Sequence, residues 1–296
     1  MTAPIACINY IERWHRIVAA RCAQHDAACA EQGRTMSDYW ARRAEGFRKF
    51  TREASAQRDP FLDCLRRHLR PEDTVLDVGA GTGRHSVPLA AHVRQLTALE
   101  PSPAMLRFLH EDVESQGLTN VDVIEGAWPD TADRTPVVDV VISAHVLYPI
   151  DDVVPFLRAL DVHARRYCFL NLMVRQPWFD QLGLWEAVHS EPRLPQPTYI
   201  DAVNILHQLG CYANVEVAWV EPPRAFDRLD DAIERFAESV AVGSEGDQRQ
   251  RLRDALAARL QPLDDGRLGV VREPYPVATV WWEAGALAES ARDITP

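Results

Sequence analysis

Hydrophobic and polar positions follow two different patterns along the chain, and the first pattern is helical. Apolar side chains recur at helical spacing over residues 5–32 and 37–56. Asp59 and Pro60 supply an N-cap and a first-turn proline for a third helix that runs to about Arg70. Residues 1–70 are therefore predicted to form an N-terminal helical cap.

After Pro71, short β-branched and apolar runs alternate with segments of helical periodicity, such as 84–92 and 104–116. This alternation predicts a Rossmann-like, doubly wound α/β sheet, because parallel strands need helical crossovers. All strands but the last would end at one edge, where ligands bind in such sheets. The seven predicted strands are 74–78, 95–100, 121–125, 137–143, 167–174, 214–220 and an antiparallel 277–283.

Two segments interrupt this alternation. Residues 175–197 contain four prolines and one short apolar helix, 178–188, and residues 221–276 contain two amphipathic helices near 229–240 and 247–260. Both follow strands that end at the carboxyl edge of the sheet, so we expect them to form lids over it. The expected organisation is a cap at 1–70 and one catalytic domain at 71–296 that carries both lids.

The turn after the first strand is rich in glycine and is preceded by a carboxylate. It reads Asp77-Val78-Gly79-Ala80-Gly81-Thr82-Gly83-Arg84. The dinucleotide-binding pattern G-x-G-x-x-G would place a glycine at position 84, where this chain has arginine. The carboxylate favours a ligand with an ammonium group over a pyrophosphate. The second strand then ends at Glu100, which is positioned to accept hydrogen bonds from both hydroxyls of a ribose.

In these motifs and their order, the sequence resembles the class I S-adenosylmethionine-dependent methyltransferases. The resemblance covers roughly residues 37–220 and the last strand, and it implies S-adenosyl-L-methionine as the cofactor. It also implies that the glycine loop lines the methionine part of the cofactor, that Glu100 binds the ribose and that Met105 borders the adenine. Many members have an aspartate where this chain has Ala127, so adenine recognition falls to the backbone and to stacking on Trp128. The residues that the resemblance assigns to the cofactor are Tyr39, Asp77, Gly79, Ala80, Gly81, Gly83, Glu100, Pro101, Met105, Ala127, Trp128 and Ser143.

Catalytic candidates follow the fourth strand, in the loop that the resemblance places beneath the sulfonium. His145 comes directly after this strand and is the first candidate for a base; a hydrogen-bonded structural histidine is the alternative. Tyr148 is the second candidate, and His189 in the first lid is a weaker third. The motif of DNA amino methyltransferases and the carboxylate set of metal-dependent catechol enzymes are both missing, so we expect no metal.

The lysine count and the net charge further restrict the functions that the chain could have. Lys49 is the one lysine among 32 basic residues, and it follows no glycine loop. P-loop and Schiff-base enzymes are therefore excluded, because both need a specifically placed lysine. The net charge of −11 disfavours binding to nucleic acid.

The six cysteines form no close pairs, which is typical of reduced thiols in the cytoplasm. The start of the chain lacks the features of a signal peptide, and no apolar run is long enough to span a membrane. We expect a cytoplasmic enzyme without membrane contact.

The expected function is methyl transfer from S-adenosylmethionine to a small, partly apolar or aromatic metabolite. Three chain segments meeting at one mouth imply an enclosed acceptor site, and the aromatic residues of these segments are candidates for its walls. Two alternatives stay open: a non-catalytic protein that binds the cofactor or a partner, and a methyltransferase that acts on RNA or protein. The sequence pattern does not define the acceptor atom or the oligomeric state.

Overall fold

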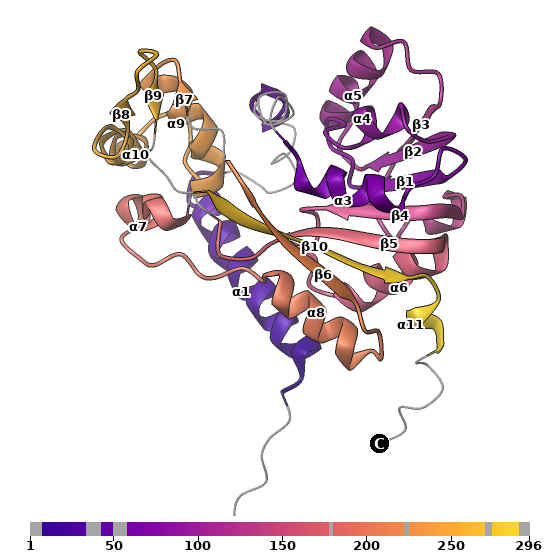
Figure 1. Cartoon of the computed structure of the whole chain (residues 1–296). Helices are drawn as coiled ribbons and strands as arrows, with labels where there is room; N and C mark the ends of the chain where they lie inside the picture. Colours follow the sequence, from indigo (N-terminus) through magenta and orange to yellow (C-terminus); the bar gives the residue numbers. More distant parts are fainter. Residues whose placement is uncertain are drawn as a thin grey trace, which may run out of the picture.

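The computed structural model describes residues 8–33, 43–49, 58–177, 180–221, 225–269 and 274–289. Its centre is a seven-stranded sheet with the order β3-β2-β1-β4-β5-β10-β6 (Figure 1). β10 is antiparallel to β5 and β6, whereas β1 to β5 pair in parallel. The predicted doubly wound sheet with an antiparallel last strand is confirmed. Its strands are β1 (Thr74–Val78), β2 (Gln95–Glu100), β3 (Val121–Glu125), β4 (Val138–Ala144), β5 (Ala164–Met173), β6 (Asn214–Val220) and β10 (Tyr275–Glu283).

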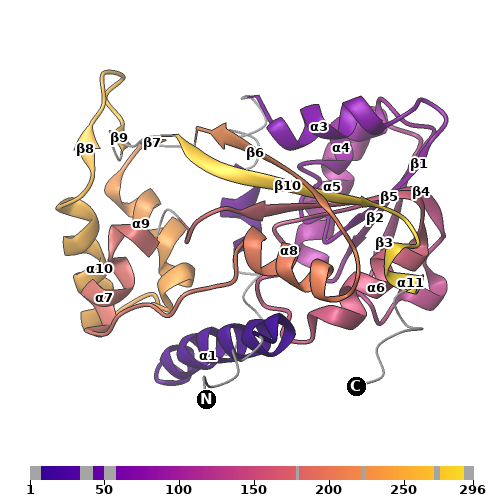
Figure 2. The ribbon, with the colours of Figure 1, turned by 60° about the horizontal axis from the view of Figure 1, so that its bottom comes forward.

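Helices cover both faces of this sheet, as the crossover connections require (Figure 2). One face packs on α3 (Pro60–His68), α4 (Ser86–Ala90) and α5 (Pro103–Ser115). The opposite face packs on α1 (Tyr10–Ala30), α6 (Val153–His163), α8 (Tyr199–Gln208) and α11 (Ala286–Glu289). The N-cap expected at Asp59 is present, and Ser102 caps α5 in the same way; each side chain accepts a backbone N–H of the helix that follows.

The lid segments form a second, smaller hydrophobic core beside the sheet. It contains apolar residues of α7 (Leu184–His189), α9 (Leu229–Ala237) and α10 (Asp247–Ala257). A three-stranded sheet of β7 (Ala225–Phe226), β8 (Gln261–Pro262) and β9 (Leu268–Gly269) borders it, which the sequence pattern did not predict because each strand is only two residues long.

Helix α1 joins the two cores. Trp14 and Val18 in its first half are buried in the core of the large sheet, whereas Ala28 and Cys29 near its end are buried in the lid core. Side chains at both ends thus fix the helix, and the lid lies beside the carboxyl edge of the sheet (Figures 1 and 2).

Two predicted helices are shorter or broken in the structure. The helix expected over 178–188 is a 3-10 turn at Asp180–Leu182 followed by α7, since Gly183 has φ 61° and interrupts the helical backbone. The helix expected over 229–240 ends as an α-helix at Ala237 and continues as a 3-10 turn, Glu238–Val240.

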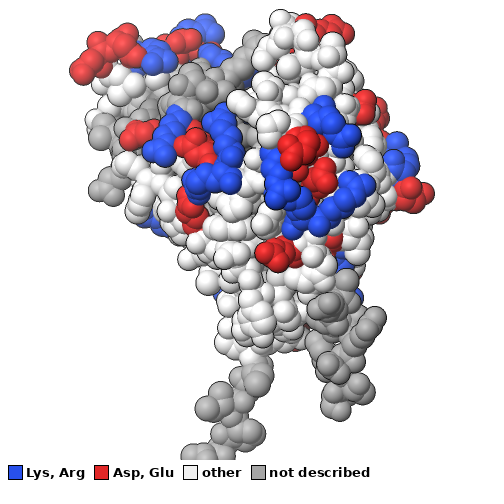
Figure 3. All heavy atoms as spheres, turned by 45° about the vertical axis from the view of Figure 1, so that its right-hand side comes forward, with Lys and Arg blue, Asp and Glu red and all other residues white. Residues whose placement is uncertain are grey.

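Basic and acidic side chains are interleaved on the face in Figure 3, which shows no continuous basic surface. Many arginines form ion pairs within the chain, including Arg67 with Glu216, Arg165 with Asp139 and Arg166 with Asp73. In the part of the chain that the structure describes, no helix is long and apolar enough to cross a membrane.

Candidate functional site

The glycine loop after β1 packs against the loop after β4. The Gly79 N–H donates to the Leu99 carbonyl at 2.8 Å, and Gly79 has φ 77°. A Cβ at this position would lie 2.3 Å from Val146 Cγ2, which is closer than any real contact. Only glycine therefore lets the loop and the residues after β4 approach each other in this way.

Glu100 ends β2 with its carboxylate turned toward the glycine loop. Its Oε2 accepts the Gly81 N–H at 3.0 Å, and its Oε1 accepts the Ser102 N–H at 3.0 Å. The residue is 6% exposed, and burial raises the pKa of Glu100, although the two N–H groups favour the charged form. Among the described residues it has no lysine or arginine partner, so its charge is held by backbone donors alone.

Asp77 is a second buried carboxylate at the same strand ends. It is 2% exposed, and Ser86 Oγ donates to its Oδ2 at 2.6 Å. Burial raises the pKa of Asp77, while the neighbouring His85 and the bond from Ser86 act in the opposite direction. Like Glu100, it forms no ion pair with lysine or arginine in the described ranges.

A short helix at residues 43–49 lies over the glycine loop. A Cβ on Gly81 would lie 3.6 Å from Phe47 Cε1. Ala44 packs with Met105 and Phe108 of α5, and Arg48 bonds Glu111 and Asp112 on the same helix at 2.5 and 2.7 Å. Sequence reasoning missed Phe47 as a site residue, although its place in an amphipathic helix before the sheet was recognised. Tyr39, predicted to touch the cofactor, lies outside the described residues.

The expectation that Trp128 stacks on an adenine does not agree with its position. Its indole is 7% exposed, its Nε1 donates to the Phe156 carbonyl at 3.3 Å, and its ring packs edge-on against His163. The indole is part of the hydrophobic core beneath α6. Burial of a large apolar ring is more favourable there than on the exposed side of the turn. Ala127 beside it is exposed, and Pro101 is exposed at the start of α5.

His145 and Tyr148 form a hydrogen-bonded pair in the loop after β4. His145 has φ 59°, in the left-handed region that histidine tolerates better than most residues, and its N–H donates to the Asn171 carbonyl. Its Nδ1 lies 3.0 Å from Tyr148 Oη, which in turn accepts the Met173 N–H at 2.8 Å. The sequence thus identified two residues that the fold brings together.

The surroundings of this pair disfavour charge on both rings. Burial, with the positive charge of Arg84 and His85, lowers the pKa of His145 to about 3. Burial also raises the pKa of Tyr148 well above its usual value. Both side chains are therefore neutral near pH 7.

A further polar group was missed by the sequence reasoning. Asn171 on β5 is 2% exposed, and its Oδ1 has no hydrogen-bond partner among the described residues. It pairs in register with Ala144, the residue before His145. The available signal was a single polar residue in the otherwise apolar run at 167–174, the predicted fifth strand.

Asp59 connects the helical cap to the glycine loop. Its Oδ2 lies 2.9 Å from Arg84 Nη2 and 3.3 Å from His85 Nε2. Burial opposes its ionisation, but the hydrogen bonds and charges of His85 and Arg84 outweigh burial and hold the pKa of Asp59 below its usual range. Asp59 therefore both caps α3 and holds Arg84 and His85, the two residues that follow Gly83.

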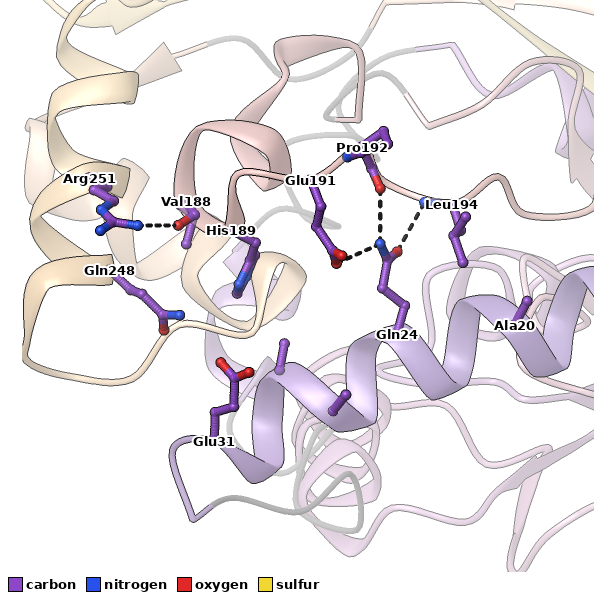
Figure 4. A pocket seen from close by; sticks show the side chains of 12 residues that line it. Ala20, Gln24, Glu31, Val188, His189, Glu191, Pro192, Leu194, Gln248 and Arg251 are labelled. Atoms are coloured by element: carbon purple, nitrogen blue, oxygen red, sulfur yellow. Dashed lines mark hydrogen bonds between the residues drawn. The ribbon is translucent and has the colours of Figure 1, made fainter.

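The lid and α1 enclose a cavity of about 570 Å³ that shares no residue with the glycine loop (Figure 4). Three predicted segments meet there: α1, the residues after α7, and α10. Several of its polar side chains already bond within the chain: Gln24 to Glu191, Pro192 and Leu194, His189 to the Val240 carbonyl, and Arg251 to the Val188 carbonyl. The bonds of Gln24 hold α1 to the lid, and the other two connect α7 to Val240 and to α10 within the lid.

The remaining predicted residues make contacts that stabilise the fold. Ser143 Oγ donates to the Val78 carbonyl at 3.0 Å, which ties β4 to β1 beside the glycine loop. The aromatic rings of Trp185 and Phe226 pack in or against the lid core, so they do not serve as walls beside the loop. In the described ranges no group of three or more His, Cys, Asp or Glu side chains could hold a metal ion, and Cys22, Cys64, Cys168 and Cys211 form no disulfide.

The strand ends fit a ligand that combines hydroxyl groups with positive charge. Two buried carboxylates, Asp77 and Glu100, lie beside a glycine loop in which Gly79 and Gly81 are partly exposed. Buried charges of this kind are compensated by hydrogen-bond donors or cations, and among the described residues neither carboxylate forms a salt bridge with lysine or arginine. Gly81 and Ser102 fix the orientation of one carboxylate, and Ser86 fixes the other.

Comparisons with known proteins identify a methyltransferase domain in the part of the chain that contains the glycine loop. Residues 75–165 match the family model of a methyltransferase domain, a range that holds the glycine loop, Glu100 and His145. The predicted family is confirmed for this domain.

Two curated relatives illustrate the extent of the likeness. The chain is 30% identical over 161 residues to an uncharacterized protein of Haemophilus influenzae, covering 54% of this chain and 58% of that protein. It is 40% identical over 92 residues to ribosomal RNA small subunit methyltransferase G of Streptomyces avermitilis, covering 29% and 38%. The alignments thus span about half or less of these relatives.

Solved structures with a similar arrangement include YcgJ of Bacillus subtilis, with 13% identity, a TM-score of 0.49 and coverage of 75% of this chain and 97% of that one. Magnesium protoporphyrin IX methyltransferase of Synechocystis has 16% identity, a TM-score of 0.44 and coverage of 74% and 84%.

Proposed function

We propose that this chain, a member of the class I S-adenosylmethionine-dependent methyltransferases, transfers a methyl group to a small and partly apolar acceptor. The observation that carries the proposal is the pair of buried carboxylates, Asp77 and Glu100, around a glycine loop in a methyltransferase domain. S-adenosylmethionine supplies an activated methyl group on a sulfonium. What the protein must add is orientation of the acceptor and exclusion of water.

In this proposal Glu100 binds the ribose hydroxyls, because its carboxylate is already oriented by Gly81 and Ser102. Asp77 and the backbone of the glycine loop hold the methionine part. Phe47 covers Gly81 and limits the access of water from the side of the helical cap. Met105, 1% exposed beneath helix 43–49, supports the adenine side of the site through packing.

Support for a small acceptor comes from the covered carboxyl edge of the sheet. The 43–49 helix lies over the glycine loop, and the lid core lies beside the same edge (Figure 1). A site bounded in this way favours a metabolite over a folded macromolecule.

RNA is the second candidate substrate, because several relatives are named as ribosomal RNA small subunit methyltransferases or probable ones. The net charge of −11 argues against it, as do the many arginines that are paired with carboxylates. This alternative predicts methylation of ribosomal RNA at low salt that weakens steeply as salt is raised.

Calorimetric titration tests the cofactor assignment first. The full chain should bind both S-adenosylmethionine and its demethylated product S-adenosylhomocysteine, and absence of binding to either would refute the proposal. A transfer assay with tritiated methyl groups then compares pooled small metabolites with ribosomal RNA. Label in RNA alone would replace the small-molecule assignment with the second candidate.

A further inference from the structure

The His145–Tyr148 pair has a defined direction of hydrogen bonding. The Met173 backbone N–H can only donate, so Tyr148 Oη is the acceptor of that 2.8 Å bond. The hydroxyl keeps its own hydrogen, and among the described residues its remaining partner is His145 Nδ1 at 3.0 Å. Tyr148 therefore donates to Nδ1, and Nδ1 carries no proton.

The position of the proton on the imidazole follows from this direction. A neutral imidazole whose Nδ1 accepts a hydrogen bond carries its hydrogen on Nε2. The low pKa of His145, caused by burial and by the charges of Arg84 and His85, agrees with a ring that stays neutral. Asp59, the carboxylate that acts on His145 from α3, is already engaged by Arg84 and His85.

We propose that His145 is a hydrogen-bond donor to the methyl acceptor through Nε2–H, and that Tyr148 is the residue that fixes this tautomer. The site then takes acceptors whose nucleophilic lone pair is already free at neutral pH, such as a carboxylate, one oxygen of which accepts Nε2–H while the other attacks. Methyl transfer would form the carbon–oxygen bond as the methyl–sulfur bond of the sulfonium breaks and its electron pair remains on sulfur, which leaves no proton for His145 to remove. The assignment of the acceptor class rests on the proposed function, whereas the tautomer of His145 does not.

The position of His145 in the fold supports its role as a hydrogen-bond donor to the methyl acceptor. Val146, the next residue, packs directly on Gly79, so His145 stands beside the loop assigned to the methionine part of the cofactor. The left-handed backbone of His145, with φ 59°, is strained, and such strain is concentrated at functional sites. A base role, as predicted from the sequence, would instead require a free Nε2 lone pair near pH 7.

Nitrogen NMR on the full chain labelled with ¹⁵N-histidine tests the tautomer without any substrate. We expect the His145 spectrum to show a protonated Nε2 and an unprotonated Nδ1 from pH 6 to pH 8, with the signal assigned by its loss in His145→Gln. His68 is an internal control of the opposite kind, because its Nδ1 lies 2.9 Å from the Cys64 carbonyl and must carry the hydrogen when neutral. A proton on Nδ1 of His145, or an imidazolium at pH 7, would overturn the proposal.

Tyr148→Phe tests the positioning role. Removal of the hydroxyl should convert the single His145 tautomer into a mixture, and an unchanged spectrum would show that Tyr148 does not set it. A transfer screen with tritiated S-adenosylmethionine completes the test: carboxylic acids should accept label, whereas the corresponding alcohols and phenols should not. Transfer to alcohols or phenols that is lost in His145→Gln would establish a base and overturn the donor role. Failure of cofactor binding by calorimetry is a separate result, which would refute the proposed function and leave the tautomer intact.

Discussion

The Gly81 backbone N–H donates to Glu100 Oε2 at 3.0 Å and so connects the glycine loop after β1 to the end of β2. The two motifs lie almost twenty residues apart along the chain, yet they form one structural unit. Replacement of Glu100 therefore alters both the proposed ribose ligand and the support of the loop.

Glu100→Gln should weaken binding of S-adenosylmethionine about 10- to 100-fold, because hydrogen bonds to a charged group contribute about 1.5–3 kcal/mol. Calorimetric titration measures the change. Glu125 is a matched control, since it pairs with Glu100 in register at the end of β3 but is exposed. Glu125→Gln should bind as the unsubstituted protein does; equal weakening in both variants would contradict the ribose assignment.

Gly79→Ala should disturb both the glycine loop and the residues after β4. The new Cβ would lie 2.3 Å from Val146 Cγ2 at a left-handed φ, for a cost of about 2 kcal/mol or more in unfolding free energy. Urea denaturation measures this cost, and cofactor affinity should fall with it. Gly117→Ala is the control, because Gly117 has φ 64° but open space around it. Adding Val146→Ala to Gly79→Ala should recover part of the loss; no recovery would mean that the contact with Val146 is unimportant.

Acid should destabilise the protein partly through His145. Its pKa is about 3 in the fold and 6.5 in the unfolded chain, so the unfolded state binds the extra proton between these values. Stability is therefore retained above pH 6.5 and lost as the pH falls toward 3, with a slope of up to about 1.4 kcal/mol per pH unit. Denaturation curves of the protein and of His145→Gln between pH 4 and pH 8 should converge at low pH. Parallel pH profiles would show that His145 titrates normally.

Gln24→Leu should loosen the attachment of α1 to the lid. The Gln24 amide bonds to Glu191, Pro192 and Leu194, so its loss leaves several groups without partners at a cost of about 1–3 kcal/mol. Hydrogen exchange of residues 184–194 should become faster, while exchange in β1 and β4 should not change. Arg16→Leu is the control on the same helix, because its side chain is 72% exposed and its one ion pair among the described residues is with Glu12. Unchanged exchange in Gln24→Leu would contradict the proposed attachment.

The sequence by itself determined the sheet and the composition of the glycine loop. β1, β2, β3 and β6 begin and end at the predicted residues, whereas β4, β5 and β10 differ from the prediction by one to three residues. β1 and β2 were recognisable because a strand buried on both faces is apolar along most of its length, and β3 and β6 at the two edges of the sheet include polar residues as well. Asp77, the glycines and Glu100 could be assigned together because short connections fix their spacing in a parallel sheet. Asp59 was identified as an N-cap from the proline that follows it.

Only the tertiary structure decided how residues far apart in the chain share an environment. It buried Trp128 in the core, placed Phe47 over Gly81 and brought the Met173 N–H to the hydroxyl of Tyr148. No local pattern contains these contacts, because each depends on which face of one element packs on another. For the same reason the chemistry expected of His145 changed: the sequence predicted a base, whereas burial and the bond to Tyr148 favour a neutral hydrogen-bond donor.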